Sequence, residues 1–236
     1  AGHTSADLDY VATTSLALNS GTIKDAGLNA ATLTLPAIGA DGSLAVNKDI
    51  VIDTTVPTVA ITSTTTGVSD GSTTSDATIA LTFTTSESTT DFVVGDIAVG
   101  NGALSSFTAV SGTSYTAIFT PTGQGACTID VAADKFTDGA SNDNTASDQF
   151  NWTFDNVAPT VTGVTSTKAD GTYGTGVSVP ITVTFSEAVN VTGTPQITLE
   201  TGTSDAVVNY STGTGTNTLT FNYTVAAGHT SADLDY

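Results

Sequence analysis

The stretch Thr78-Ile-Ala-Leu-Thr-Phe-Thr84 alternates apolar and polar side chains, so that Ile79, Leu81 and Phe83 share one side of an extended chain. Side chains that recur every two residues lie on one face of a β-strand. Similar runs recur along the sequence, separated by clusters of Gly, Asn, Asp and Ser that favour turns. The pattern predicts an all-β fold built from antiparallel β-sandwiches. The other runs are 150–154, 177–185 and 219–225, with shorter alternations at Leu16 and Leu18, Leu33 and Leu35, and Ile50 and Ile52.

The composition excludes several classes of partner. Of the 236 residues, 39% are hydrophobic, which is enough for a packed core, and no run of 18 apolar residues indicates a membrane span. Four Lys, no Arg and 23 acidic residues give a formal net charge of −19. Such a surface repels phosphate groups, so we expect no nucleic-acid partner and no membrane insertion. The acidity has two interpretations, solubility of an extracellular bacterial protein or cation binding.

The sequence AGHTSADLDY occurs twice, at residues 1–10 and 227–236, which gives a period of 226 residues. A fixed period is the sign of a repeat array. We interpret the chain as one period plus the first ten residues of the next copy. The expected partners are therefore adjacent identical repeats, and the sequence leaves open whether they form a covalent tandem array or a homopolymer of separate subunits.

A second, looser repetition divides the period. Ile52-Asp53-Thr-Thr-Val-Pro57-Thr-Val returns 102 residues later as Phe154-Asp155-Asn-Val-Ala-Pro159-Thr-Val, and each part has the size of one β-sandwich domain. Proline at the start of a strand lacks a backbone donor, which suits the first strand at a sheet edge.

Two sandwiches per period follow from this division. Residues 54–155 form a complete sandwich, residues 156–236 form the N-terminal part of the other, and residues 1–53 form the C-terminal part of a sandwich of that second kind. By itself, 156–236 would expose an unfilled apolar groove, so the functional object is a polymer in which the sandwiches follow head to tail as a rod.

Several segments resemble known bacterial repeats. DTTVPTVAITS, FTAVSGTSYTAIFTPTGQG and KFTDGASNDNTAS are similar to Ig-like repeats of giant bacterial surface adhesins. ITVTFSEAVNVTGTPQITLETG, TNTLTFNYTVAAG and SLALNSGTIKDAGLNAATL are similar to the cadherin-like, or SwmB-type, repeats that accompany them. The resemblance implies long arrays at the bacterial cell surface, and families of this kind often carry calcium between domains.

The acidic residues fall where an Ig strand order would gather them. In that order the BC and FG loops lie at the pole of the N-terminal linker. The predicted ligands are Asp53, Glu87, Asp91, Asp134, Asp138 and Asp143 for the 54–155 domain, Asp155, Glu187, Asp25 and Asn29 for the other domain, and Asp233 and Asp235 in an expected EF loop at the far pole. Calcium prefers such oxygen ligands. The alternative is that these residues are ordinary turn formers; the recurrence of linker Asp, Ser-Glu and D-x-x-x-N in both domains favours Ca²⁺.

The sequence shows no arrangement of residues typical of a catalytic site. The two histidines, His3 and His229, occupy the same repeat position, and a single cysteine cannot support a zinc site. Cys127 alternates with polar neighbours, which predicts a core position. We therefore expect no enzyme but a structural repeat of an extracellular filament, stalk or adhesin shaft. The rival hypothesis is a glycan- or protein-binding module, which would expose aromatic side chains such as Tyr115, Tyr173 and Tyr210.

Overall fold

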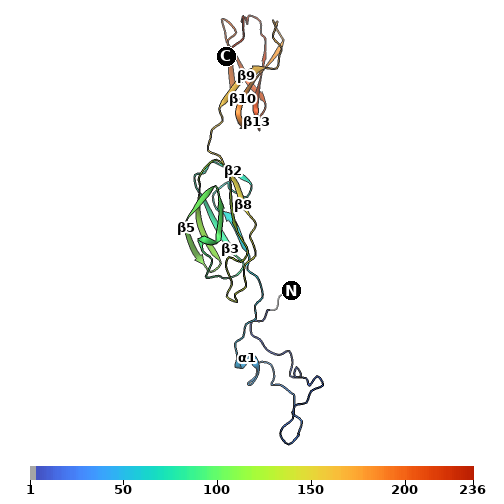
Figure 1. The fold of residues 1–236 in the computed structure, drawn as a ribbon. Coiled ribbons are helices and arrows are strands. Elements are labelled where there is room, and N and C mark those ends of the chain that lie inside the picture. The colour runs from blue at the N-terminus through green and yellow to red at the C-terminus, as the bar shows by residue number, and fades with distance from the viewer. Residues whose placement is uncertain (1–3) are drawn as a thin grey trace. The chain divides into compact units, whose positions relative to one another are not determined.

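The computed structural model describes residues 4–236, so the first three residues of the ten-residue repeat, including His3, lie outside the described part. Strands make up 41% of the chain and helices 3%, in several antiparallel sheets, which confirms the predicted all-β fold. The chain divides into two compact units between Asn156 and Val157, each described by itself below (Figure 1).

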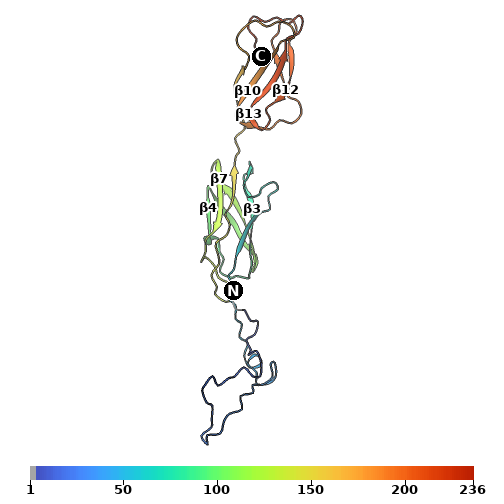
Figure 2. The same ribbon diagram turned by 90° about the vertical axis from the view of Figure 1, so that its right-hand side faces the viewer.

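The first unit contains a β-sandwich between residues 59 and 154. Its strands are β1 (Val59–Ser63), β2 (Ser72–Thr74), β3 (Ile79–Thr85), β4 (Ile97–Gly100), β5 (Gly102–Ser111), β6 (Ser114–Pro121), β7 (Gly125–Val131) and β8 (Phe150–Phe154). One sheet has the order β1-β3-β6-β5 and the other β2-β8-β7-β4. Figure 2 labels β3 of the first sheet and β4 and β7 of the second. All pairs are antiparallel except β2–β8. The strand β7 thus lies between β4 and β8 and is hydrogen-bonded along both of its edges.

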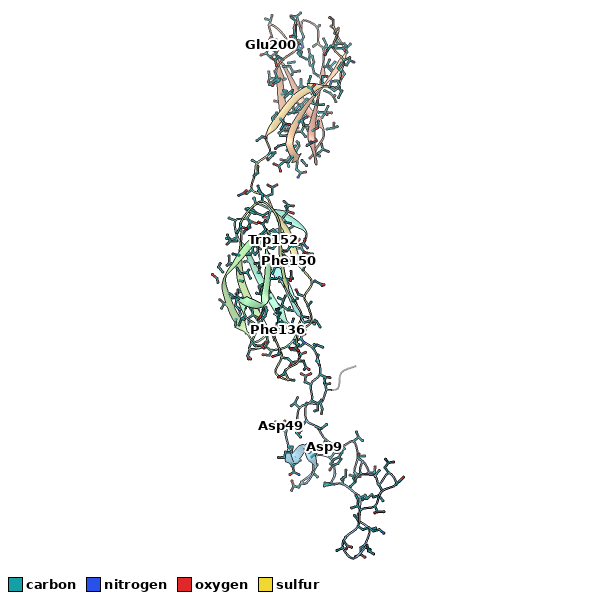
Figure 3. The ribbon with its side chains drawn as sticks, in the orientation of Figure 1. Asp9, Asp49, Phe136, Phe150, Trp152 and Glu200 are labelled. Atoms are coloured by element: carbon teal, nitrogen blue, oxygen red, sulfur yellow. The ribbon has the colours of Figure 1, made fainter. Side chains whose placement is uncertain are left out.

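The core of the sandwich follows the predicted alternation. Ile79, Leu81 and Phe83 are at most 1% exposed. The rings of Phe119 and Trp152 meet edge to face with centroids 4.6 Å apart, a contact that stabilises the core beyond the burial of both rings. Figure 3 labels Trp152 and its neighbour Phe150 in the sandwich. Cys127 is fully buried, as its alternation predicted.

The N-terminal segment, residues 4–53, differs from the expected strands. The alternations at Leu16 and Leu18, Leu33 and Leu35, and Ile50 and Ile52 form no sheet there, and the pairing consists of isolated bridges, Ser5↔Ile52 and Lys24↔Ala30. Leu16 and Leu18 are 42% and 43% exposed. The physical reason is that an alternating pattern becomes a strand only beside a hydrogen-bonded neighbour, and these residues pair with no strand of the sandwich.

Helices are few and short. The α-helix α1 spans Leu44–Asn47 and the 3₁₀-helix η1 spans Val94–Asp96. Within residues 4–236, no helix has the length and apolar character needed to cross a membrane.

The second unit is built on one five-stranded sheet. Its strands are β9 (Val161–Ser166), β10 (Ser178–Val189), β11 (Gln196–Leu199), β12 (Ala206–Thr212) and β13 (Thr216–Thr224), in the order β11-β12-β13-β10-β9. Val179, Ile181 and Val183 of β10 point to the same face as Leu219 and Phe221 of β13, as the alternation predicted. This face forms the apolar core of the unit.

A substitution at Gly102 tests how tightly the core of the sandwich is packed. A Cβ at this position would overlap the ring of Phe119. Because core overpacking typically costs about 1–3 kcal/mol, we expect Gly102→Ala to lower the free energy of unfolding by that amount in denaturant titrations. Gly95→Ala is the matched control, since nothing lies within 4 Å of the position that its added methyl group would take. Equal effects of the two substitutions would contradict this account.

Candidate metal centre

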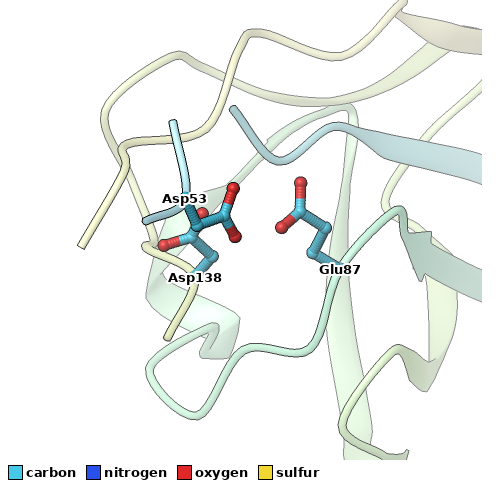
Figure 4. A group of neighbouring side chains, drawn as sticks. All are labelled: Asp53, Glu87 and Asp138. Atoms are coloured by element: carbon cyan, nitrogen blue, oxygen red, sulfur yellow. The ribbon is translucent and has the colours of Figure 1, made fainter. Parts of the chain in front are cut away.

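Three carboxylates meet at the pole of the sandwich where its N-terminal linker begins. Asp53 precedes β1, Glu87 follows β3, and Asp138 lies in the loop between β7 and β8 (Figure 4). One oxygen of each lies within 4.8 Å of the others. Within residues 4–236, this is the one group of three or more acidic, His or Cys side chains that offers ligand atoms so close together.

Asp138 is placed by the turn that it begins. Its Oδ1 accepts the backbone N–H groups of Ala140 and Asn142, at 2.8 and 2.9 Å, and its Oδ2 accepts the Asn142 amide at 2.8 Å. The Asn142 amide also donates to the Asp53 backbone carbonyl at 3.2 Å. The D-x-x-x-N pattern therefore joins the loop to the linker.

Asn144 positions the same loop and was missed by the sequence analysis. It is 2% exposed, and its Oδ1 accepts the N–H groups of Lys135 and Phe136 at 2.7 and 2.9 Å. Its amide donates to the carbonyls of Ala132 and Thr145, at 2.9 and 2.7 Å. In a loop rich in Asp, Asn and Ser, no residue pattern distinguishes this buried asparagine from its exposed neighbours.

Glu87 enters the group from a loop held against the first strand. Thr58 N–H donates to Ser86 Oγ and Ser86 N–H to the Thr58 carbonyl, both at 2.9 Å, while Thr85 Oγ1 donates to the Glu87 carbonyl at 2.7 Å. Glu87 Oε1 is buried and has no hydrogen-bond partner. Desolvation raises the pKa of Glu87, and the charges of Asp53 and Asp138 raise it further.

The pKa of Asp138 is shifted in the opposite direction, below its ordinary value. Burial alone would raise its pKa, but the hydrogen bonds from Asn142, Ala140 and Ser141 outweigh that effect and hold the pKa below its ordinary value. The group therefore combines an aspartate stabilised as an anion with a glutamate whose negative charge is opposed by its surroundings.

Asp91 lies at the same pole but serves the loops. Its carboxylate accepts Thr137 N–H at 3.1 Å, Thr137 Oγ1 at 2.8 Å and Thr89 Oγ1 at 2.6 Å. Burial would raise its pKa, and these hydrogen bonds lower it overall. Asp91 thus ties the loop after β3 to the loop that carries Asp138.

The remaining predicted ligands do not join a group of three such side chains within residues 4–236. Asp134 and Asp143 are exposed in the β7–β8 loop, Asp155 follows β8 and accepts from Gln124, and Glu187 lies half-buried in β10. The backbone N–H and the side-chain amide of Asn29 donate to the Asp25 carboxylate. The Ser231 hydroxyl donates to the backbone carbonyl of Asp233, and the Glu200 N–H donates to the backbone carbonyl of Asp235. Their roles as ligands stay predictions.

The opposite pKa shifts predict how stability depends on pH in the presence of a chelator. Glu87, with its raised pKa, contributes stability that is lost as the pH rises above 4.5 and through the raised value. Asp138, with its lowered pKa, contributes stability above pH 3.8 that is lost on acidification through the lowered value. We expect denaturant titrations to show both limbs and Glu87→Gln to flatten only the upper one. An unchanged upper limb in this variant would contradict the assignment.

The comparisons with known proteins concern the sandwich that carries this centre. No curated protein matches the chain. Residues 53–154 match the family model of a bacterial Ig-like domain, and this segment begins at the linker residue Asp53 and ends with the last strand of the sandwich. Such domains are commonly surface-exposed or extracellular and typical of structural modules without catalysis. The match supports the Ig-like interpretation of this domain.

Proposed function

We propose that the chain is a structural repeat of a long extracellular bacterial filament, stalk or adhesin shaft, and that Ca²⁺ binds where the linker meets the Ig-like sandwich. The convergence of Asp53, Glu87 and Asp138 from three separate segments carries this proposal. One of these segments is the linker itself, so an ion bound there would fix the direction in which the chain enters the domain.

The geometry of the group suits calcium. Calcium holds oxygens at 2.3–2.6 Å, so two of its ligands lie up to about 5 Å apart, which accommodates the 4.8 Å spread of these carboxylates. Three carboxylates so close repel one another unless a cation neutralises them. The buried, unpartnered Oε1 of Glu87 and the raised pKa of that side chain both support a cation as the missing partner.

The mechanical role rests on repetition and charge. The ten-residue repeat with a period of 226 residues supports identical repeats as the partners, and the net charge of −19 would keep neighbouring filaments apart until salt or divalent ions screen it. Bound calcium would stiffen each junction, while the number of repeats would set the reach.

A binding module is less well supported. Of the three tyrosines whose exposure would favour it, Tyr115 is 3% exposed, and Tyr173 and Tyr210 are half-buried. The hydroxyl groups of Tyr115 and Tyr173 donate to backbone carbonyls, and that of Tyr210 accepts the Thr214 N–H. These tyrosines act within the domains and form no exposed aromatic platform.

Calcium should stabilise the sandwich. A ligand specific to the folded state contributes about 2.7 kcal/mol at a hundred times its Kd. We expect the Tm of the sandwich, measured by calorimetry, to rise from excess chelator to millimolar Ca²⁺. Asp138→Asn and Glu87→Gln should each abolish most of this rise, because each removes one charged ligand.

Asp148→Asn is the matched control. Asp148 is an exposed acid of the same β7–β8 loop outside the carboxylate group, so this variant should keep the full calcium response. Equal Tm values of the unaltered chain in calcium and in chelator would overturn calcium binding as a stabilising event.

A further inference from the structure

The apolar face of residues 157–236 is less completely covered than the core of the sandwich. Its most buried core residue, Leu199, is 2% exposed and the others are 5–8% exposed, whereas most core residues of the sandwich are at most 3% exposed and five are 6–8% exposed. A groove of about 550 Å³ opens on this face, lined by apolar side chains that include Val183, Phe185, Leu219 and Phe221. The face lacks most of a second sheet.

The complete sandwich shows what a second sheet requires. There, β7 is the central strand, and Ile129 pairs with Val99 of β4 on one edge and with Phe150 of β8 on the other. A strand in this position uses backbone groups on both edges, since successive residues of an antiparallel strand direct their N–H and C=O groups to alternate sides.

The two copies of the ten-residue repeat each show one half of this pairing. In the second copy, Thr230 N–H donates to the Thr201 carbonyl and Glu200 N–H donates to the Asp235 carbonyl, both at 2.9 Å. Leu234, between them, packs against the apolar core of the unit. The second copy therefore contacts the chain that follows β11 through one isolated bridge, Glu200↔Asp235, and one further backbone hydrogen bond.

The first copy uses other backbone groups. Ser5 exchanges two hydrogen bonds with Ile52, at 2.7 and 3.0 Å, and Leu8 N–H donates to the Ile50 carbonyl at 2.8 Å. Ser5 and Leu8 correspond to Ser231 and Leu234 of the second copy. Neither bond set uses the groups of the other, so the two sets do not compete for the same backbone donors and acceptors.

Residues 11–53 also carry the turn that follows a central strand. Asp25 and Asn29 repeat the hydrogen bonds of Asp138 and Asn142: backbone to Oδ1 at 2.8 Å, amide to Oδ2 at 2.8 Å, and Asp N–H to the Asn carbonyl at 3.0 Å. Leu28 and Ser141 share a positive φ, 68° and 66°. The turn Asp25–Asn29 thus has the same hydrogen bonds as the turn Asp138–Asn142, although residues 11–53 belong to no sheet.

We propose that residues 11–53 of a second copy of this chain cover the apolar face of residues 157–236, with the ten-residue repeat as the shared central strand. Residues 227–236 keep their hydrogen bonds to Glu200 and Thr201 on one edge. On the other edge they form hydrogen bonds with Ile50 and Ile52 of the second copy, which are released from that copy's own residues 4–10. Because the exchanged strands are identical, the hydrogen bonds to Ile50 and Ile52 are re-formed.

The driving force is burial of apolar surface on both partners. Ile23, Leu28 and Val51 of the incoming segment are 46%, 76% and 62% exposed, and no residue of 4–53 belongs to either apolar core. The proposal rests on the proposed function, because it names the surface by which identical repeats join.

Disulfide trapping tests this pairing in the full chain. Ser231→Cys with Ile52→Cys places one thiol in each partner at the position of the Ser5–Ile52 pair. Such hydrogen-bonded pairs have Cα atoms about 5.5 Å apart, within disulfide range. We expect oxidation to give disulfide-linked dimers and longer chains on a non-reducing gel. Adding Ser5→Pro should raise their yield, because it removes the N–H that holds Ile52 within its own copy.

The matched control is Ser231→Cys with Val51→Cys, because a shift of one residue turns the side chain to the other face of the strand. Its yield should fall to that of the single-cysteine variants, and Cys127, fully buried, should stay reduced. Equal yields from Ile52→Cys and Val51→Cys, monomers only, or a disulfide within one chain would each overturn the proposal.

If the cysteine variants do not fold, analytical ultracentrifugation of the unaltered chain tests the proposal instead. A mass that rises above 23.6 kDa with concentration supports the pairing, and a constant monomer mass overturns it. The two proposals fail separately, since a chain that stays monomeric but gains Tm in calcium would retain the calcium-binding centre and lose only this joining surface.

Discussion

The structure depends on a single constraint, that a central strand needs hydrogen-bonded neighbours on both edges and an apolar layer on one face. In the sandwich, β7 meets this constraint between β4 and β8, and the residues beneath it are excluded from solvent. Residues 227–236 form no strand and meet the chain after β11 in one isolated bridge, and the apolar face of the second unit stays partly open. The difference between the two units follows from strand pairing, because both have the same kind of alternating sequence.

The carboxylate group is a consequence of the same loop architecture. The turn Asp138–Asn142 is held by its own hydrogen bonds and by Asn144, so its geometry does not need a cation. The linker and Glu87 are brought to it by the pairing of Thr58 with Ser86. A cation would therefore act on a site already assembled, and its effect would be to offset the desolvation of Glu87 and the repulsion by Asp53 and Asp138, which together raise the pKa of Glu87.

The sequence predicts those strand faces and turns that depend only on residues close together along the chain. Alternation identified the inward faces of β3, β8, β10 and β13, and D-x-x-x-N identified two turns that have matching hydrogen bonds. Of twelve predicted ligands, only Asp53, Glu87 and Asp138 form a close group. Which acidic residues lie close together depends on the paths of the loops, and the composition does not specify these paths. Asp91, for example, accepts hydrogen bonds from Thr137 and does not join the group. The strands expected at Leu16 and Leu33 require a neighbouring sheet, so their alternation alone could not produce them.

A repeat of ten residues within a period of 226 has a structural meaning on this view. If identical repeats join as proposed, the joint must present the same segment to both sides, because residues 227–236 repeat residues 1–10. The segment meets this requirement with separate backbone groups for Glu200 and Thr201 and for Ile50 and Ile52. A strand shared in this way would carry tension through hydrogen bonds that run across it and are loaded in shear, which is the mechanical property that a shaft made of such repeats would need.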